Sequence, residues 1–128
     1  PLWDMPEHRP AIVDPAQMSA DLSARARAYL HSNCANCHRP TGPTPSNMDL
    51  RQDTALNATN ACDTIPLSGN LGIADARIIT PGDASRSVLV NRMSRRDVNG
   101  MPPLASAITD AQGISLITAW IDDLSSCQ

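Results

Sequence analysis

Two cysteines and a histidine stand within five consecutive positions, and this cluster constrains the chain more than any other feature. Residues 32–40 are SNCANCHRP, so two residues separate Cys34 from Cys37, and His38 follows directly. The whole chain of 128 residues contains only four cysteines and three histidines. On one helical turn, residues three apart present their side chains to the same side. The cluster therefore predicts one ligand shared by two thiols and an imidazole.

The spacing C-x-x-C-H is the pattern of c-type haem attachment. Each thiol can form a thioether to one of two neighbouring haem vinyl groups, and the adjacent imidazole can bind the iron. We therefore expect one covalent haem c, attached through Cys34 and Cys37, with His38 as an axial iron ligand. A redox dithiol and a coincidental motif are alternatives, although a dithiol of the thioredoxin kind needs a βαβ context that is missing here. A further alternative is a zinc site, whose four ligands would be Cys34, Cys37, His38 and Cys62.

The aromatic content of the chain is low. It has no phenylalanine, one tyrosine and two tryptophans. Because large aromatic side chains usually dominate core burial, a planar apolar cofactor could fill part of the interior. A core made only of leucine, isoleucine, valine and alanine is the alternative.

Charge and hydropathy argue against two classes of partner. The net charge is −3 and no basic stripe is present, so we do not expect a nucleic-acid partner. No apolar run approaches the roughly 20 residues that cross a bilayer, so no membrane span is expected. The chain begins at Pro1 without an initiator methionine or signal peptide, and we expect a processed product or a domain cut from a larger protein.

The chain is long enough for one mainly helical domain, which we place at residues 19–128. Spaced prolines over residues 1–18 predict a linker or a wrapping arm. Helix caps are expected at Ser19, at Asp83 and in a capping box of Thr109 with Gln112. A short extended piece is expected over Ala76–Ile79. The expected helices cover about Ala20–Ser32, Asp53–Asn60, Asp83–Met93 and Thr109–Leu124.

Met101 is the expected second axial ligand. It lies in NGMPPLAS, where Pro102 and Pro103 hold the backbone extended and make a stiff loop that can present the thioether to iron. Met93 is the second choice, although its place on a helical face favours packing in the core. A histidine–methionine pair raises the reduction potential and closes the iron to small ligands. The other candidates are Met5, Met18, Met48, His8 and His31.

Cys62 and Cys127 remain once the haem cysteines are assigned. Haem c is attached outside the cytoplasm in bacteria, where thiols tend to oxidise. We therefore predict a Cys62–Cys127 disulfide, with two separate thiols as the alternative. The expected location is the bacterial periplasm, the cell surface or the medium.

Haem propionates need cationic partners because they are costly to bury unpaired. Six arginines flank the expected pocket in the sequence, and most of them should be solvated. Arg51 and Arg86 are the two that we expect to pair with the propionates.

Over about residues 19–125 the chain resembles a class I cytochrome c. The matching pieces are a helix with Tyr29 and Leu30 before CANCH, then GMPP with Met101, then a last helix with AWI at 119–121. The resemblance implies an all-α fold of about four helices with long ordered loops wrapped around one haem. It also implies that the first and last helices cross closely, with Tyr29 or Leu30 against Trp120, and that one haem edge is exposed.

A narrower resemblance covers residues 73–103. This stretch is similar to the haem domains attached to secreted bacterial quinone-dependent sugar dehydrogenases. Related modules occur in carbohydrate-binding proteins regarded as electron donors of lytic polysaccharide monooxygenases. The resemblance implies a redox protein partner, either a sugar dehydrogenase or such a monooxygenase.

We expect a monomeric electron-transfer domain that transforms no substrate itself and can be a module of a larger redox enzyme. The electron would cross at the exposed haem edge near Cys34 and Cys37. The alternative is a haem enzyme or gas sensor with an open distal site, in the manner of a peroxidase. That function would need a distal histidine or arginine and no methionine on the iron.

Overall fold

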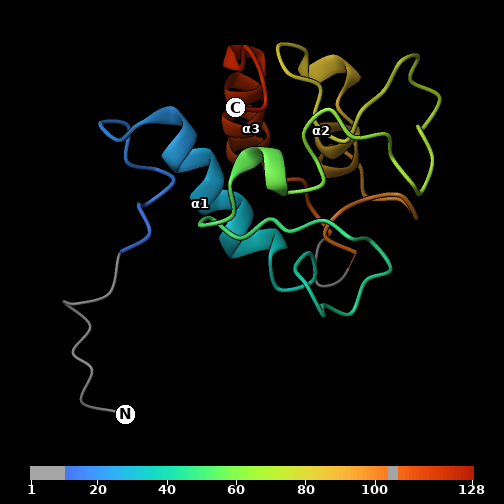
Figure 1. Ribbon diagram of the computed structural model, residues 1–128, viewed down its shortest axis with the longest axis horizontal. Helices are drawn as coiled ribbons and strands as arrows, with labels where there is room; N and C mark the ends of the chain where they lie inside the picture. Colours follow the sequence, from blue (N-terminus) through green and yellow to red (C-terminus); the bar gives the residue numbers. More distant parts are fainter. Residues whose placement is uncertain (1–10, 104–106) are drawn as a thin grey trace.

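The computed structural model describes residues 11–103 and 107–128, and this part of the chain is helical (Figure 1). No strand is formed within these ranges, and the extended piece expected near residue 79 forms isolated bridges only. The helical class is therefore as expected, with three α-helices and two 3₁₀ turns in place of about four helices. The elements are α1 (Leu22–Cys34), η2 (Leu56–Ala58), η3 (Ala84–Arg86), α2 (Val88–Met93) and α3 (Ala111–Asp123).

Helix α1 begins and ends two residues later than expected. The Asp21 carboxylate, and not Ser19, caps it by accepting a 3.0 Å hydrogen bond from the Ala24 amide. The residues before it form a turn in which the Ala20 amide donates to the Gln17 carbonyl, and this turn delays the helix. At its other end the helix includes Cys34, so the first cysteine of the motif lies on its last turn.

The expected helix over residues 53–60 contracts to the single 3₁₀ turn η2. The Ala58 amide donates to Ala55, as a 3₁₀ turn requires, and Asn60 has a positive φ of 55° that ends the turn. The Arg27 side chain from α1 donates to the Thr54 carbonyl and so competes for the helical hydrogen bonds of this segment.

The expected helix over residues 83–93 is interrupted at Ser87. Asp83 does cap the first part, because its carboxylate accepts from the Ser85 amide at 3.0 Å. Ser87 is extended, with φ −97° and ψ 113°, and the next amide, that of Val88, donates to the Arg77 carbonyl at 2.9 Å. A contact with a distant segment thus replaces the helical bond and separates η3 from α2.

Helices α1 and α3 pack against each other, and Gly113 of α3 lies in their contact. Tyr29 of α1 lies directly over Gly113, where a Cβ atom would overlap the tyrosine ring. The Tyr29 hydroxyl donates to Asp110 at 2.8 Å, and Asp110, rather than the expected Thr109, caps α3 through the Gly113 amide. Leu30 and Trp120 are both buried in the same cluster. The main core residues are Ala26, Leu30, Leu50, Ile79, Ile117, Trp120 and Ile121.

The Cys62–Cys127 disulfide is present, with a Cα–Cα distance of 5.8 Å. It joins the loop that follows η2 to the segment that follows α3. The prediction from the sequence is therefore confirmed for this pair.

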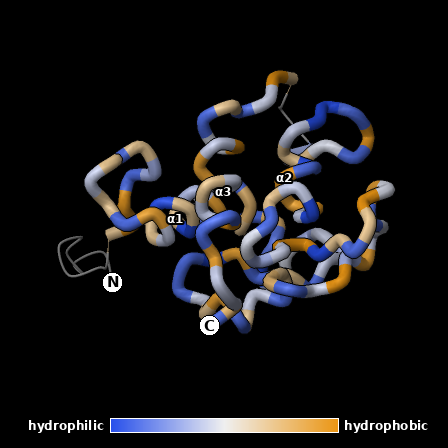
Figure 2. The backbone as a smooth tube through the Cα atoms, turned by 90° about the horizontal axis from the view of Figure 1, so that it is seen from above, coloured by the Kyte–Doolittle hydropathy of each residue, from blue (hydrophilic) through white to orange (hydrophobic). Residues whose placement is uncertain are grey.

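Hydrophobic and hydrophilic stretches alternate along the backbone and do not gather in one long run (Figure 2). In the described ranges, no helix combines the length and the apolar character that a bilayer crossing requires.

Candidate cofactor site

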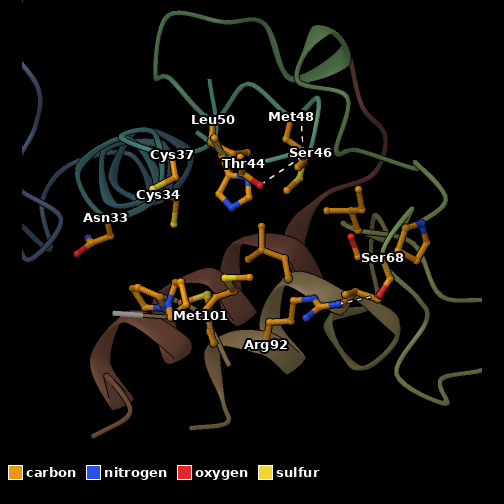
Figure 3. A pocket seen from close by; sticks show the side chains of 18 of the residues that line it. Asn33, Cys34, Cys37, Thr44, Ser46, Met48, Leu50, Ser68, Arg92 and Met101 are labelled. Atoms are coloured by element: carbon orange, nitrogen blue, oxygen red, sulfur yellow. Dashed lines mark hydrogen bonds between the residues drawn. The ribbon is translucent and has the colours of Figure 1, made fainter. Parts of the chain in front are cut away.

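A cavity of about 610 Å³ lies between the end of α1, α2, the start of α3 and several loops (Figure 3). Its volume falls within the range of about 300–1,000 Å³ that is typical of small-molecule sites. Cys34 and Cys37 lie on one wall, and Met101 lies on the wall that faces them (Figure 3). Residues that are distant in the sequence thus meet at one cavity. Among its lining residues are Cys34, Cys37, His38, Met48, Leu50, Ile78, Val88, Leu89, Met93, Met101 and Ile114.

One carbonyl group folds the CANCH segment into a single turn. The amides of Cys37 and His38 both donate to the Cys34 carbonyl, at 3.1 and 2.8 Å. The His38 carbonyl then accepts from the Leu50 amide at 2.9 Å, which ties the motif to the loop beyond it. The two thiols and the imidazole therefore reach the cavity from one short, hydrogen-bonded segment.

The two motif cysteines differ in exposure but are both free thiols. Burial, with a smaller contribution from Cys37, raises the pKa of Cys34 to about 11, so this thiol is protonated at neutral pH. Cys37 is exposed. Neither is in a disulfide, although all four cysteines lie within the described ranges. Both sulfurs are therefore chemically available to form a covalent bond with a ligand in the cavity.

The His38 imidazole is suited to be a ligand. Burial lowers its pKa, which favours the neutral form that carries a free lone pair. Its Nδ1 atom is buried with no hydrogen-bond partner among the described residues. A buried polar atom without a partner in the protein can be satisfied by a water, an ion or a bound group. Together with the cavity volume and the free thiols, this ring fits a haem attached at this wall.

The facing wall holds Met101 through its backbone. The Met101 amide donates to the Arg92 carbonyl at 2.9 Å. The Met101 carbonyl accepts from Nη1 of Arg96 at 3.0 Å, and Nη2 of Arg96 donates to the Met93 carbonyl at 2.9 Å. Met93 and Met48 also line the cavity, and Met93 is packed in the core as its helical position predicts.

The remaining candidate ligands lie elsewhere or outside the described residues. Met18 does not line the cavity. Its sulfur accepts a hydrogen bond from the Arg25 side chain. The Nδ1 atom of His31 accepts from the Gln52 amide, and His31 does not line the cavity. Met5 and His8 lie outside the described residues.

Neither of the two arginines expected at the propionates lines the cavity. Arg51 pairs with Asp49 at 2.8 Å, and Arg86 pairs with Asp83 at 2.8 Å. In each case the guanidinium forms an ion pair with a carboxylate two or three residues earlier in the chain. Arg92 and Arg96 line the cavity instead. Helical spacing could have pointed to Arg92, which follows Val88 by four residues on α2, but not to Arg96, which lies beyond the end of this helix.

The alternative zinc site loses one of its four ligands, because Cys62 is bonded to Cys127. Across residues 11–103 and 107–128, no group of three or more histidine, cysteine, aspartate or glutamate side chains is placed to hold a metal ion. This alternative four-ligand site is therefore not formed in the described part of the chain.

No family model, curated protein or solved structure matches this chain.

Proposed function

We propose that this chain is an electron-transfer domain that carries one covalent haem c. The observation that supports it best is the shared cavity. Its two facing walls bring a local C-x-x-C-H segment and a distant methionine to one space of suitable volume. Cys34 and Cys37 would hold the haem through thioethers, and His38 and Met101 would bind the iron. When bound, the haem supplies reversible one-electron exchange at its iron.

The chain's own residues would tune this exchange. An imidazole and a thioether are both uncharged donors, and this pair raises the reduction potential relative to two histidines. Leu50, Ile78 and Val88 are buried apolar residues of the lining, and they exclude water from the inner part of the cavity. A dry, apolar surrounding controls both solvent access and reduction potential. With His38 and Met101 both bound to the iron, the site would favour electron transfer over oxygen chemistry.

The proposed partner is another redox protein. The resemblance of residues 73–103 to haem domains of secreted sugar dehydrogenases points to such an enzyme, or to a lytic polysaccharide monooxygenase. The Cys62–Cys127 disulfide supports a location in an oxidising compartment, such as the bacterial periplasm, the cell surface or the medium.

The test of the covalent cofactor is the intact mass of the purified protein after acid–acetone extraction. We expect the pigment to stay with the protein and the mass to exceed the sequence mass by one haem. The double variant Cys34→Ser/Cys37→Ser should lose both properties. Pigment that extracts freely from the unaltered protein would contradict the proposal.

The test of the electron-transfer role is the visible spectrum with and without carbon monoxide. We expect a methionine–iron charge-transfer band in the oxidised protein that disappears in Met101→Ala, and little carbon monoxide binding by the reduced protein. Rapid and complete binding of carbon monoxide would instead favour the haem enzyme or gas sensor with an open distal site.

A further inference from the structure

We propose that Arg96 is a positioning residue that sets the place of the Met101 thioether. This inference rests on the proposed function, because it concerns Met101 as an iron ligand. Arg96 would not touch the iron itself. It would act through the backbone of the residue that does.

One guanidinium joins two points of the cavity wall. Nη1 of Arg96 donates to the Met101 carbonyl at 3.0 Å, and Nη2 donates to the Met93 carbonyl at 2.9 Å. Met93 is the last residue of α2, so the bond links Met101 to a helix end. A guanidinium presents its donors in a rigid plane, and the two bonds together fix the distance between the carbonyls that they join.

The segment before Met101 is held by further bonds that bring it close to the same helix. Nη1 of Arg92 donates to the Asn99 carbonyl at 3.1 Å, and the Gly100 amide donates to the Asp97 carbonyl at 2.9 Å. A Cβ atom on Gly100 would overlap the Arg95 carbonyl, so only glycine allows this approach of the two backbones. The loop of residues 97–100 therefore packs against the end of α2 directly before Met101.

The segment after Met101 cannot be held in the same way. Pro102 and Pro103 have no amide hydrogen to donate, so the backbone offers no donor for two residues. The bond from Arg96 to the Met101 carbonyl is therefore the last described tether before this proline pair. Without it, Met101 would be held by its own amide alone, and its side chain could move away from the facing wall.

The experiment compares Arg96→Gln with Arg95→Gln in the haem-loaded protein. Both variants remove one positive charge, but Arg95 pairs with Asp97 and donates to Asn91, and it makes no described bond to Met101. Imidazole is added to the oxidised protein, and the loss of the methionine–iron charge-transfer band is followed. We expect Arg96→Gln to lose the band at about tenfold less imidazole than the unaltered protein, because one charge-assisted hydrogen bond that favours methionine ligation is gone. Arg95→Gln should match the unaltered protein.

If Arg96→Gln and Arg95→Gln lose the methionine–iron band at the same imidazole concentration, the role of Arg96 is overturned. If Arg96→Gln does not fold, Arg96→Lys takes its place, because an ammonium can bond only one of the two carbonyls well. If Arg96→Lys loses the band at an imidazole concentration between the one expected for Arg96→Gln and that of the unaltered protein, the proposal is supported. If it loses the band at the same concentration as the unaltered protein, the proposal is overturned.

The ligand assignment is tested separately. If the unaltered protein lacks the methionine–iron band, or if the band survives Met101→Ala, the assignment of Met101 is wrong and this proposal fails with it. If the unaltered protein shows the band and the Arg96 variant does not change its sensitivity to imidazole, only the positioning role is contradicted.

Discussion

Asp49 is a buried carboxylate that accepts several hydrogen bonds from its own turn. It accepts from Nε and Nη2 of Arg51 at 2.9 and 2.8 Å, and from the Thr54 hydroxyl at 2.8 Å. The bonds from Arg51, above all, hold the pKa of Asp49 well below its usual range. Asp49 directly precedes Leu50, whose amide donates to the His38 carbonyl.

Replacing Asp49 with asparagine should lower the free energy of unfolding by about 1 kcal/mol near pH 6, because the ion pair with Arg51 is lost. A carboxylate whose pKa is lower in the folded state stabilises the fold fully above its unfolded pKa of about 4. This contribution falls as the pH drops below 4 toward the lower folded pKa. The difference between Asp49→Asn and the unaltered protein in urea unfolding should therefore shrink between pH 6 and pH 3.

The matched control is Asp53→Asn, which removes the same charge from an exposed position in the same segment. Its effect on the free energy of unfolding should stay small at both pH values. A difference between Asp49→Asn and the unaltered protein that stays constant over this range would show that the ion pair contributes nothing.

At the scale of elements, the contact between α1 and α3 depends on one missing side chain. Gly113 has no Cβ atom, and this absence makes room for the ring of Tyr29. Tyr29 also donates to the Asp110 carboxylate, which caps the helix that contains Gly113. The cap and the helix crossing are therefore one structural unit.

We expect Gly113→Ala to lower the free energy of unfolding by about 1–3 kcal/mol, the usual cost of overpacking. In a Tyr29→Ala background the same change should raise it by up to about 1 kcal/mol, because alanine is the better helix former. Urea unfolding of the four proteins in this cycle measures both values. Ser115→Ala, at an exposed position of α3, is the control for helix propensity. A neutral Gly113→Ala in the presence of Tyr29 would show that the Tyr29 ring can move aside without cost.

The elements could be predicted where their signals are local. Helices α1 and α3 lie close to their expected ranges because helix-forming residues and apolar spacing define them, although each is capped by a different residue from the one expected. The break at Ser87 could not be predicted, since the Val88 amide bonds a carbonyl eleven residues earlier in the chain. The choice of Asp21 over Ser19 as a cap likewise depends on the turn that precedes α1. A contact with a distant segment decided the first of these differences, and a neighbouring turn decided the second.

At the scale of the whole molecule, the disulfide closes a long loop. Cys62 and Cys127 are 65 residues apart in the sequence, and neither lines the described cavity. The link therefore restricts the unfolded chain without contributing an atom to the candidate site.

The double variant Cys62→Ser/Cys127→Ser should lose about 4 kcal/mol of stability, as expected for a loop of this length. Urea unfolding of the variant and of the unaltered protein measures this loss. The visible spectrum of the folded, haem-loaded variant should match that of the unaltered protein. A changed methionine–iron band would show that the link also shapes the cavity.

The candidate site was predictable in part. Its first wall is a five-residue motif whose chemistry follows from spacing alone, and Met101 was expected on the facing wall because of the proline pair after it. The arginines of the lining were not predicted. Arg51 and Arg86 pair with carboxylates two or three residues earlier in the chain, whereas Arg96, which has Asp97 beside it, donates to two backbone carbonyls instead. Which arginine is captured locally and which reaches the cavity is settled only once the chain is folded.

The two walls of the cavity come from parts of the chain that meet only after folding. A chain with a haem bonded covalently to Cys34 and Cys37 would keep it in strong denaturant, because covalent bonds survive unfolding. The Met101 side chain, which is not bonded covalently, would leave the iron. The visible absorption spectrum would therefore report unfolding through the loss of the methionine ligand, and no added dye would be needed to follow it.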